Sequence, residues 1–287
     1  MLRSITPNVS SLPPRYQHPG YAFLHRYGSL QEEADVLHYV DFLRESAGLA
    51  AQPPTDLDRI YQHFGIPTPL RVALDEQQGI LLDSFKGLIL IKQADPIARQ
   101  RFTEGHELME LLFDAQADVA ERLNLAQWDE TRKEQLCDAG AAELLMPRSS
   151  FQSQVKSLGV SLETAKSLAT LYQTSLLATL RRMVELSIGE HALVVWHRAL
   201  KPTERRRGKP AHPKWRIWWR VLSPNWSSGF IPRDKSVEDD SLLAQATIQP
   251  QQGAIALDLG WGTWVGNLEA MPIQIGEKSC ILSLLQR

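Results

Sequence analysis

The chain has 287 residues, of which 43% are hydrophobic and 22% are charged. This composition is that of an ordinary globular protein with room for two domains, and it excludes large-scale disorder. The formal net charge of −2 excludes a strong overall attraction to nucleic acid or anionic membranes. Two cysteines make no disulfide framework, and neither a signal peptide nor an apolar run of about 18 residues is evident. We therefore expect a soluble, cytoplasmic protein.

The first half of the sequence predicts helices around a small sheet. Residues 1–28 are rich in Pro, Ser and Gly and predict an irregular segment. Apolar residues at helical spacing predict a helix from Ser29 and a second one, "DLDRIYQHF", that ends at Gly65. Residues 70–93 contain short apolar runs broken at glycines, which predicts a small antiparallel sheet. A long helix follows after "ADPIAR".

The second half changes in character near residue 189. A helical pattern runs from about Trp128 to Pro147, and residues 148–188 predict three short helices with a helix-turn-helix-like layout. Beyond residue 189 lie seven of the eight tryptophans and several strand-like runs. The predicted fold is α+β, divided into residues 1–28, 29–147, 148–188 and a β-rich domain of residues 189–287.

The helix "RFTEGHELMELLFD", residues 101–114, carries a polar stripe. His106 and Glu110 lie about 40° apart around the helix axis, and the apolar residues occupy the other side. A polar stripe is most often a solvated face. The next helix, however, places Glu134 and Asp138 in line with Ala141 and Leu145, which is unusual for a surface.

Two such helices, facing one another, predict a site for a divalent metal ion. Its candidate side chains come from both helices: His106, Glu107, Glu110, Glu134 and Asp138. The alternative is that the acids of the second helix pair with Arg132 or Lys133 in water.

At this point the sequence resembles the ImmA/IrrE family of metallo-endopeptidases. The resemblance covers roughly residues 30–188 and rests on "RQRFTEGHELMELLF", on a Glu about 25 positions further on, and on "AAELLMPRSSF". It implies a zincin-like peptidase domain with a Zn²⁺ ion that cleaves a helix-turn-helix repressor and thereby induces stress-response or mobile-element genes. It also implies that Glu107 is the general base, His106 a metal ligand, and Glu134 the third ligand.

The sequence departs from the family's H-E-x-x-H pattern at position 110, where Glu replaces the second His. With His106, Glu110 and Glu134 as ligands, two carboxylates would cancel the charge of the metal ion. Such an ion is a weaker Lewis acid, and an oxygen-rich ligand set shifts the preference from Zn²⁺ toward Mn²⁺.

Three outcomes follow from this substitution. Glu110 serves as a ligand in a working peptidase, or Asp138 or Cys137 completes the site as an alternative ligand. In the third outcome the chain is a pseudo-peptidase that regulates a transcription factor by binding alone. Whether the chain is an enzyme therefore stays open at this stage.

A basic run, "KPTERRRGKPAHPKWRIWWR", suggests a second function. Basic residues interleaved with tryptophans would bind single-stranded nucleic acid, with Arg205, Arg206 and Arg207 on the phosphates. The alternative is a β-hairpin with a solvated tip at residues 205–209, Arg216 and Arg220 on one face of its strand and the tryptophans on the other. We favour the hairpin, and expect a repressor protein rather than nucleic acid or a membrane as the partner.

Overall fold

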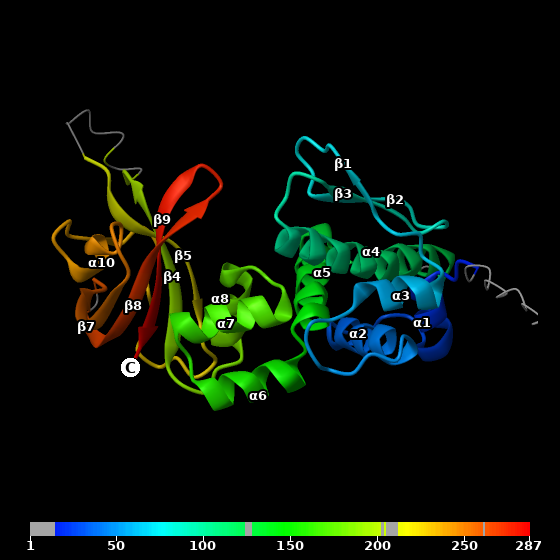
Figure 1. The fold of residues 1–287 in the computed structure, drawn as a ribbon, viewed down its shortest axis with the longest axis horizontal. Helices are drawn as coiled ribbons and strands as arrows, with labels where there is room; N and C mark the ends of the chain where they lie inside the picture. The colour runs from blue at the N-terminus through cyan, green and yellow to red at the C-terminus, as the bar shows by residue number, and fades with distance from the viewer. Residues whose placement is uncertain (1–14, 124–127, 202–203, 205–211, 261) are drawn as a thin grey trace, which may run out of the picture. The chain divides into compact units, whose positions relative to one another are not determined.

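The computed structural model describes residues 15–123, 128–201, 204, 212–260 and 262–287. It confirms the predicted α+β fold, and the chain forms two compact units (Figure 1). The first comprises residues 1–147 with 172–174, and the second residues 148–171 with 175–287. In the described ranges, no helix has both the length and the apolar character that a membrane span needs. The predicted fourfold division of the chain stays a prediction.

The first unit is built on helices α1 (Pro19–Tyr27), α2 (Ala34–Ser46), α3 (Leu57–Phe64), α4 (Ile97–Leu123) and α5 (Glu130–Leu145). Their apolar faces share one core, with Phe23, Tyr39 and Leu108 almost fully buried. As predicted, α3 ends at a glycine, and Gly65 has the left-handed backbone that favours this residue.

Helix α1 corrects the prediction of an irregular segment over residues 1–28. The His18 side chain accepts a hydrogen bond from the Tyr21 backbone N–H, and Pro19 starts the helix with a preset φ angle. Phe23 and Leu24 then bury the apolar side of the helix. The first 14 residues of that predicted segment lie outside the described residues.

The three-stranded sheet of this unit comprises β1 (Leu70–Val72), β2 (Gly79–Asp83) and β3 (Leu88–Lys92), in the order β1-β3-β2. Strands β2 and β3 form an antiparallel hairpin, as predicted. Strand β1 instead pairs with β3 in parallel, so the sheet is mixed rather than purely antiparallel. Strand β2 occupies only one edge of β3. Strand β1 pairs with the other edge of β3 and runs in the same direction as β3. Strand β2 is left at the opposite edge.

Small residues allow the helices of this unit to approach closely. A Cβ atom added to Gly105 on α4 would lie 3.3 Å from Cβ of Ala141 on α5. Gly140 on α5 lies even closer to Met109 on α4, where an added Cβ would lie 2.5 Å from the sulfur. These contacts hold α4 and α5 face to face over the stripe that the sequence singles out.

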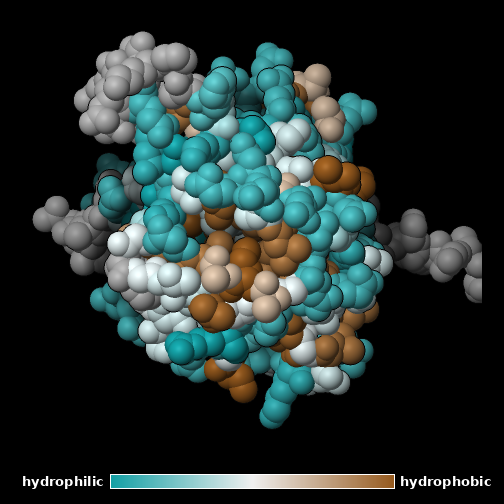
Figure 2. Space-filling view, turned by 90° about the vertical axis from the view of Figure 1, so that its left-hand side faces the viewer, coloured by the Kyte–Doolittle hydropathy of each residue, from teal (hydrophilic) through white to brown (hydrophobic). Residues whose placement is uncertain are grey.

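The second unit begins with α6 (Arg148–Leu158), α7 (Leu162–Tyr172) and α8 (Leu176–Glu185), which match the predicted short helices. A curled antiparallel sheet follows, in the order β6-β5-β4-β9-β8-β7. Its elements are β4 (His191–Ala199), β5 (Lys214–Leu222), β6 (Ser236–Val237), α10 (Leu242–Gln245), β7 (Gln251–Asp258), β8 (Thr263–Ile275) and β9 (Lys278–Gln286). Figure 2 looks onto the side that carries α10 and β7, and apolar side chains gather near its middle with hydrophilic ones around them.

A β-bulge in strand β5 corrects the predicted arrangement of its side chains. Val195 of β4 is opposite Trp219, whereas Trp196 is opposite Ile217, so Trp218 is an extra residue. The extra residue reverses the alternation of faces. Arg220, opposite buried Val194, therefore lies on the face opposite to that of Arg216. The predicted hairpin tip at residues 205–209 lies outside the described residues.

We expect Gly20→Ala to destabilise the first unit. An added Cβ would lie 2.3 Å from the backbone oxygen of Leu111 on α4, so the two helices would have to move apart. Alanine gains about 1 kcal/mol of helix propensity, but such overpacking costs typically 1–3 kcal/mol, and backbone atoms cannot rotate away. Urea unfolding should show a lower midpoint for Gly20→Ala. Gly262→Ala, where the added methyl meets nothing within 4 Å, is the control. An unchanged midpoint in Gly20→Ala would contradict this packing.

Candidate metal centre

The imidazole of His106 is the centre of the polar cluster between α4 and α5. Its Nδ1 atom lies 3.0 Å from Oδ1 of Asp138. Its Nε2 atom lies 3.7 Å from Oε1 of Glu110 and 3.6 Å from Oε2 of Glu134. The structure therefore brings His106 together with three acids that the sequence selected. Asp138 faces Nδ1, whereas Glu110 and Glu134 face Nε2.

This arrangement favours one form of the ring. A carboxylate at Nδ1 favours a proton there, so that in the neutral ring Nε2, the nitrogen facing Glu110 and Glu134, is the one free to bind a metal ion. Burial lowers the pKa of His106, but the hydrogen bond and the charge of Asp138, with the charges of Glu107 and Glu110, raise it overall. Asp138 thus lies where an orienting residue lies in a metal site, on the ring nitrogen that faces away from the other donors.

Glu107 is buried beneath the edge strand β2. Its side chain lies so close to β2 that a Cβ atom on Gly79 would come within 2.7 Å of its Oε1 atom. Burial, together with the charges of Glu110 and Glu134, raises the pKa of Glu107 to about 7, although the neighbouring His106 and a hydrogen bond from the Leu81 backbone oppose the change. A carboxyl group that titrates near neutral pH can both take up and release a proton, as a general base requires.

Lys133 is the residue that sequence reasoning misjudged. Its Nζ atom lies 2.8 Å from Oε2 of Glu110 and 3.2 Å from Oε1 of Glu130. The predicted alternative paired Arg132 or Lys133 with the acids of α5 that approach His106, but Arg132 instead pairs with Glu33. The sequence could have indicated that Lys133 lies near the site, because positions 133, 134, 137 and 138 lie on one side of a helix.

The thiol of Cys137 completes the surroundings of Glu110. Its Sγ atom lies 3.4 Å from Oε1 of Glu110, and the cysteine is fully buried. Burial raises the pKa of the Cys137 thiol, and the charge of Glu110 raises it further, so the thiol is protonated and donates the hydrogen bond.

Several donor atoms around His106 lie at distances that resemble those in a metal site. Metal–ligand bonds of about 2.0–2.1 Å in a tetrahedral zinc site leave donor atoms about 3.4 Å apart. The distances from Nε2 of His106 to the two glutamate oxygens exceed this spacing by only a few tenths of an ångström. One donor atom each from His106, Glu110 and Cys137 also lies within 4.8 Å of the others.

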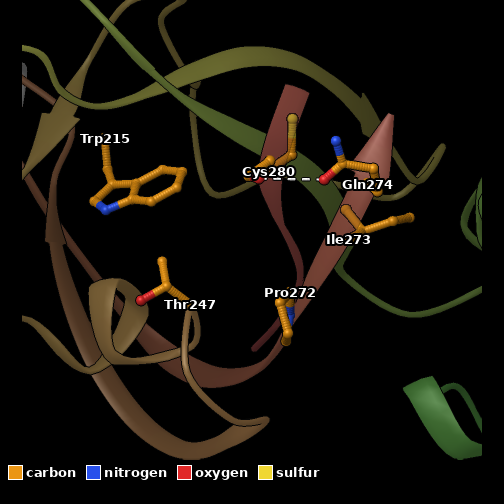
Figure 3. Close-up of a pocket in the computed structure, with 7 residues that line it drawn as sticks. Trp215, Thr247, Pro272, Ile273, Gln274 and Cys280 are labelled. Atoms are coloured by element: carbon orange, nitrogen blue, oxygen red, sulfur yellow. Dashed lines mark hydrogen bonds between the residues drawn. The ribbon is translucent and has the colours of Figure 1, made fainter. Parts of the chain in front are cut away.

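The second unit contains a cavity of about 320 Å³ (Figure 3). Its lining residues are Trp215, Thr247, Pro272, Ile273, Gln274, Ser279 and Cys280. No charged side chain is among them, and the side chain of Gln274 is held by a hydrogen bond from Ser279. The cavity is neutral and mostly apolar, and nothing in its lining indicates a reaction.

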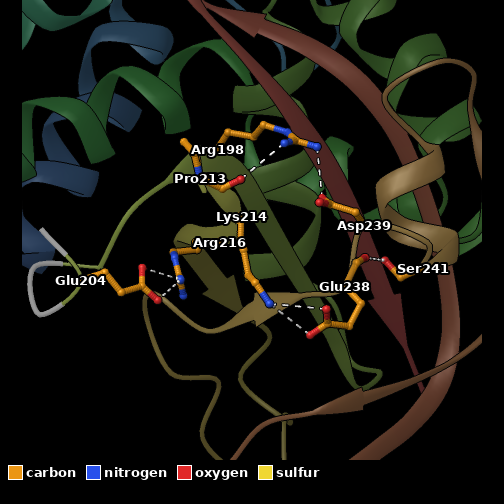
Figure 4. Close-up of polar contacts among 8 residues, drawn as sticks. All are labelled: Arg198, Glu204, Pro213, Lys214, Arg216, Glu238, Asp239 and Ser241. Atoms are coloured by element: carbon orange, nitrogen blue, oxygen red, sulfur yellow. Dashed lines mark hydrogen bonds and ion pairs between the residues drawn. The ribbon is translucent and has the colours of Figure 1, made fainter. Parts of the chain in front are cut away.

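Two basic residues in the described part of the basic run form ion pairs within the second unit (Figure 4). Arg216 is 1% exposed and donates to Glu204 and to the backbone oxygens of Ala199 and Asp234. Lys214 pairs with Glu238. These two residues therefore stabilise the fold instead of offering a free charge to phosphate groups. Arg205, Arg206 and Arg207 lie outside the described residues.

The short helices of residues 148–185 likewise offer little to DNA. Of the two arginines on the predicted recognition helix, now α8, Arg181 pairs with Glu185 at 2.8 Å and Arg182 is buried. This arrangement fits the predicted packing or docking role better than contact with phosphates.

Residues 63–184 match the family model described as the IrrE N-terminal-like domain. The match lies within the segment that resembles the ImmA/IrrE family, so that resemblance is confirmed. A solved structure described as a Mycobacterium tuberculosis transcriptional regulator superposes with a TM-score of 0.56 at 12% sequence identity. The superposition covers 94% of this chain and 80% of that one, which shows a shared fold. No curated protein matches the sequence significantly.

We expect Asp138→Asn to lower the pKa of His106, because the amide keeps the hydrogen bond and removes the charge. A raised His pKa stabilises the folded state fully below the unfolded value of 6.5, and this contribution is lost as pH rises through the folded value. Asp138→Asn should therefore lose folding stability mainly below about pH 6.5, and little above the folded pKa of His106. Histidine ring signals in NMR titrations measure the pKa, with Glu121→Gln on the exposed end of α4 as control. A His106 pKa that is unchanged in Asp138→Asn would refute the pairing.

Proposed function

Because residues 63–184 of this chain belong to the IrrE N-terminal-like family, we propose that the protein is a metal-dependent endopeptidase of the ImmA/IrrE type. Its proposed substrate is a helix-turn-helix transcriptional repressor, whose cleavage would induce stress-response or mobile-element genes. One observation carries the proposal: Nε2 of His106 faces two carboxylates while Asp138 holds Nδ1.

In this proposal His106, Glu110 and Glu134 hold the metal ion, and Asp138 orients the imidazole. Cys137 is the alternative donor beside Glu110. A divalent ion in such a site supplies Lewis-acid chemistry, polarising a peptide carbonyl and making water more acidic. The two carboxylates favour a harder ion than the family's usual ligand set does, so both Zn²⁺ and Mn²⁺ are candidates.

Glu107 would act as the general base. It would take a proton from the attacking water molecule and pass it to the amine of the leaving peptide. The burial that raises its pKa to about 7 also excludes bulk water from the carboxylate. Glu107 is thus able to exchange protons near neutral pH.

The edge position of β2 suits a peptide substrate. One side of β2 pairs with β3, and the strand lies next to α4 with Gly79 touching Glu107. An edge strand offers backbone N–H and C=O groups to an extended chain, which would pass close to Glu107 when it pairs there.

Lys133 favours a second candidate function, a catalytically inactive protein that binds a transcription factor. Its ammonium group already neutralises Glu110 at 2.8 Å and competes with a metal ion for that carboxylate. Burial lowers the pKa of Lys133, but hydrogen bonds and charges from Glu110 and Glu130 raise it overall, so the ammonium stays charged. The two functions are distinguished by whether the metal ion or the lysine holds Glu110.

We expect the purified protein, grown with zinc and manganese, to hold one equivalent of metal by elemental analysis. Glu107→Gln should retain that metal and cleave a repressor encoded beside the gene at least about 100-fold more slowly, the usual minimum for loss of a general base. His106→Ala should lose the metal. Protein that holds no stoichiometric metal would remove the peptidase proposal and leave the binding function.

Lys133→Met should raise metal affinity about tenfold, because Glu110 no longer has to exchange an ammonium partner for the ion. Methionine retains most of the buried volume of the lysine stem. Lys86→Met is the matched control, since Lys86 pairs with Asp83 away from the candidate site. Competition with a chromophoric chelator measures the affinity. Equal affinities in wild type and Lys133→Met would mean that Glu110 does not bind the ion.

A further inference from the structure

A second cavity of the molecule adjoins the candidate metal centre. It has a volume of about 280 Å³ and begins at Glu110 and Lys133. The other lining residues come from the C-terminal half of α4, from Leu81 of β2, from Trp128 just before α5 and from Glu130 at the start of α5. Because Glu110 lines both, whatever enters this cavity lies next to the proposed metal ligands.

One wall of the cavity is apolar. Phe113 and Trp128 meet edge to face with ring centroids 6.1 Å apart, and Leu81 is half-buried on β2. The small side chains of Ala117 and Ala120 leave the space beside them open. Such a wall suits the aliphatic part of a long side chain, and an indole ring also attracts cations.

The polar part of the cavity carries excess negative charge. Its carboxylates belong to Glu110, Asp114 and Glu130, and its single cation is Lys133. With Glu110 bound to the metal ion in the proposed function, Asp114 and Glu130 against Lys133 leave a formal sum of −1. Lys133 is shared between Glu110 and Glu130, whereas exposed Asp114 has no ion-pair partner in the described part of the chain. A positively charged group is therefore the complement that this cavity lacks.

We propose that this cavity is a specificity subsite that accepts a lysine or arginine side chain of the substrate peptide, next to the bond that is cut. The assignment rests on the proposed peptidase function. The aliphatic stem packs against Phe113 and Trp128, and the cationic end reaches Asp114 and Glu130. The same carboxylates repel acidic side chains, so selectivity arises from rejection as well as attraction.

The test measures occupancy of the cavity directly. The full-length Glu107→Gln variant, labelled with 5-fluorotryptophan, is titrated with N-acetyl-arginine methylamide, and the ¹⁹F signal of Trp128 is followed. Trp128→Phe assigns that signal. Matched probes carry norleucine or glutamate in place of arginine. We expect saturable binding of the arginine probe, binding of norleucine at least fivefold weaker, and no response to glutamate.

Two charge variants locate the selectivity. Asp114→Asn with Glu130→Gln should weaken arginine binding to the norleucine level, and Glu121→Gln should leave it unchanged. The proposal is overturned if the Trp128 signal ignores arginine, if arginine and norleucine bind equally, or if the double variant keeps its preference. Cleavage is scored separately with metal-loaded wild type. Arginine-selective binding without cleavage of any peptide would count against the peptidase function and not against the cavity's selectivity.

Discussion

The close approach of α4 and α5 is the constraint on which the candidate site depends. Gly105 against Ala141, and Gly140 against Met109, leave no room for larger side chains between the helices. Because the helices are this close, the side chain of His106 on α4 reaches Asp138 and Glu134 on α5. A wider gap would separate His106 from these two half-exposed acids, and charged pairs in water contribute little. The small residues are thus as much a part of the site as its charged ones.

The sequence predicted much of the site, because its geometry follows from helical periodicity. Two polar stripes at helical spacing sufficed to bring His106, Glu110, Glu134 and Asp138 together. Periodicity could not say which ring nitrogen each acid faces, since this depends on how each helix is rotated about its axis. It also could not assign the partner of Lys133, whose long side chain reaches Glu110 or remains in water according to the packing around it. The roles proposed for these residues stay predictions.

The fold was predicted less evenly. The α+β class and the helices of residues 148–185 followed from hydrophobic patterns and from breaks at glycine and proline. Helix α1 was missed because the composition around it is rich in Pro and Gly, although Phe23 and Leu24 bury one side of it. The parallel pairing of β1 depends on contacts distant in sequence, which no local pattern contains. The bulge at Trp218 was missed because a regular strand was assumed, although the adjacent Trp218 and Trp219 interrupt the alternation.

The ion pair between Lys133 and Glu110 has a consequence for the protein before it meets a metal ion. Clustered carboxylates repel one another in a folded chain, and many metal sites therefore order only when the ion arrives. Here an internal ammonium group supplies part of the missing positive charge. The first unit would then fold without a metal ion at this cluster, because the charge of Glu110 is already balanced inside the protein. A chain with such an internal counter-charge needs no ion to keep these helices together.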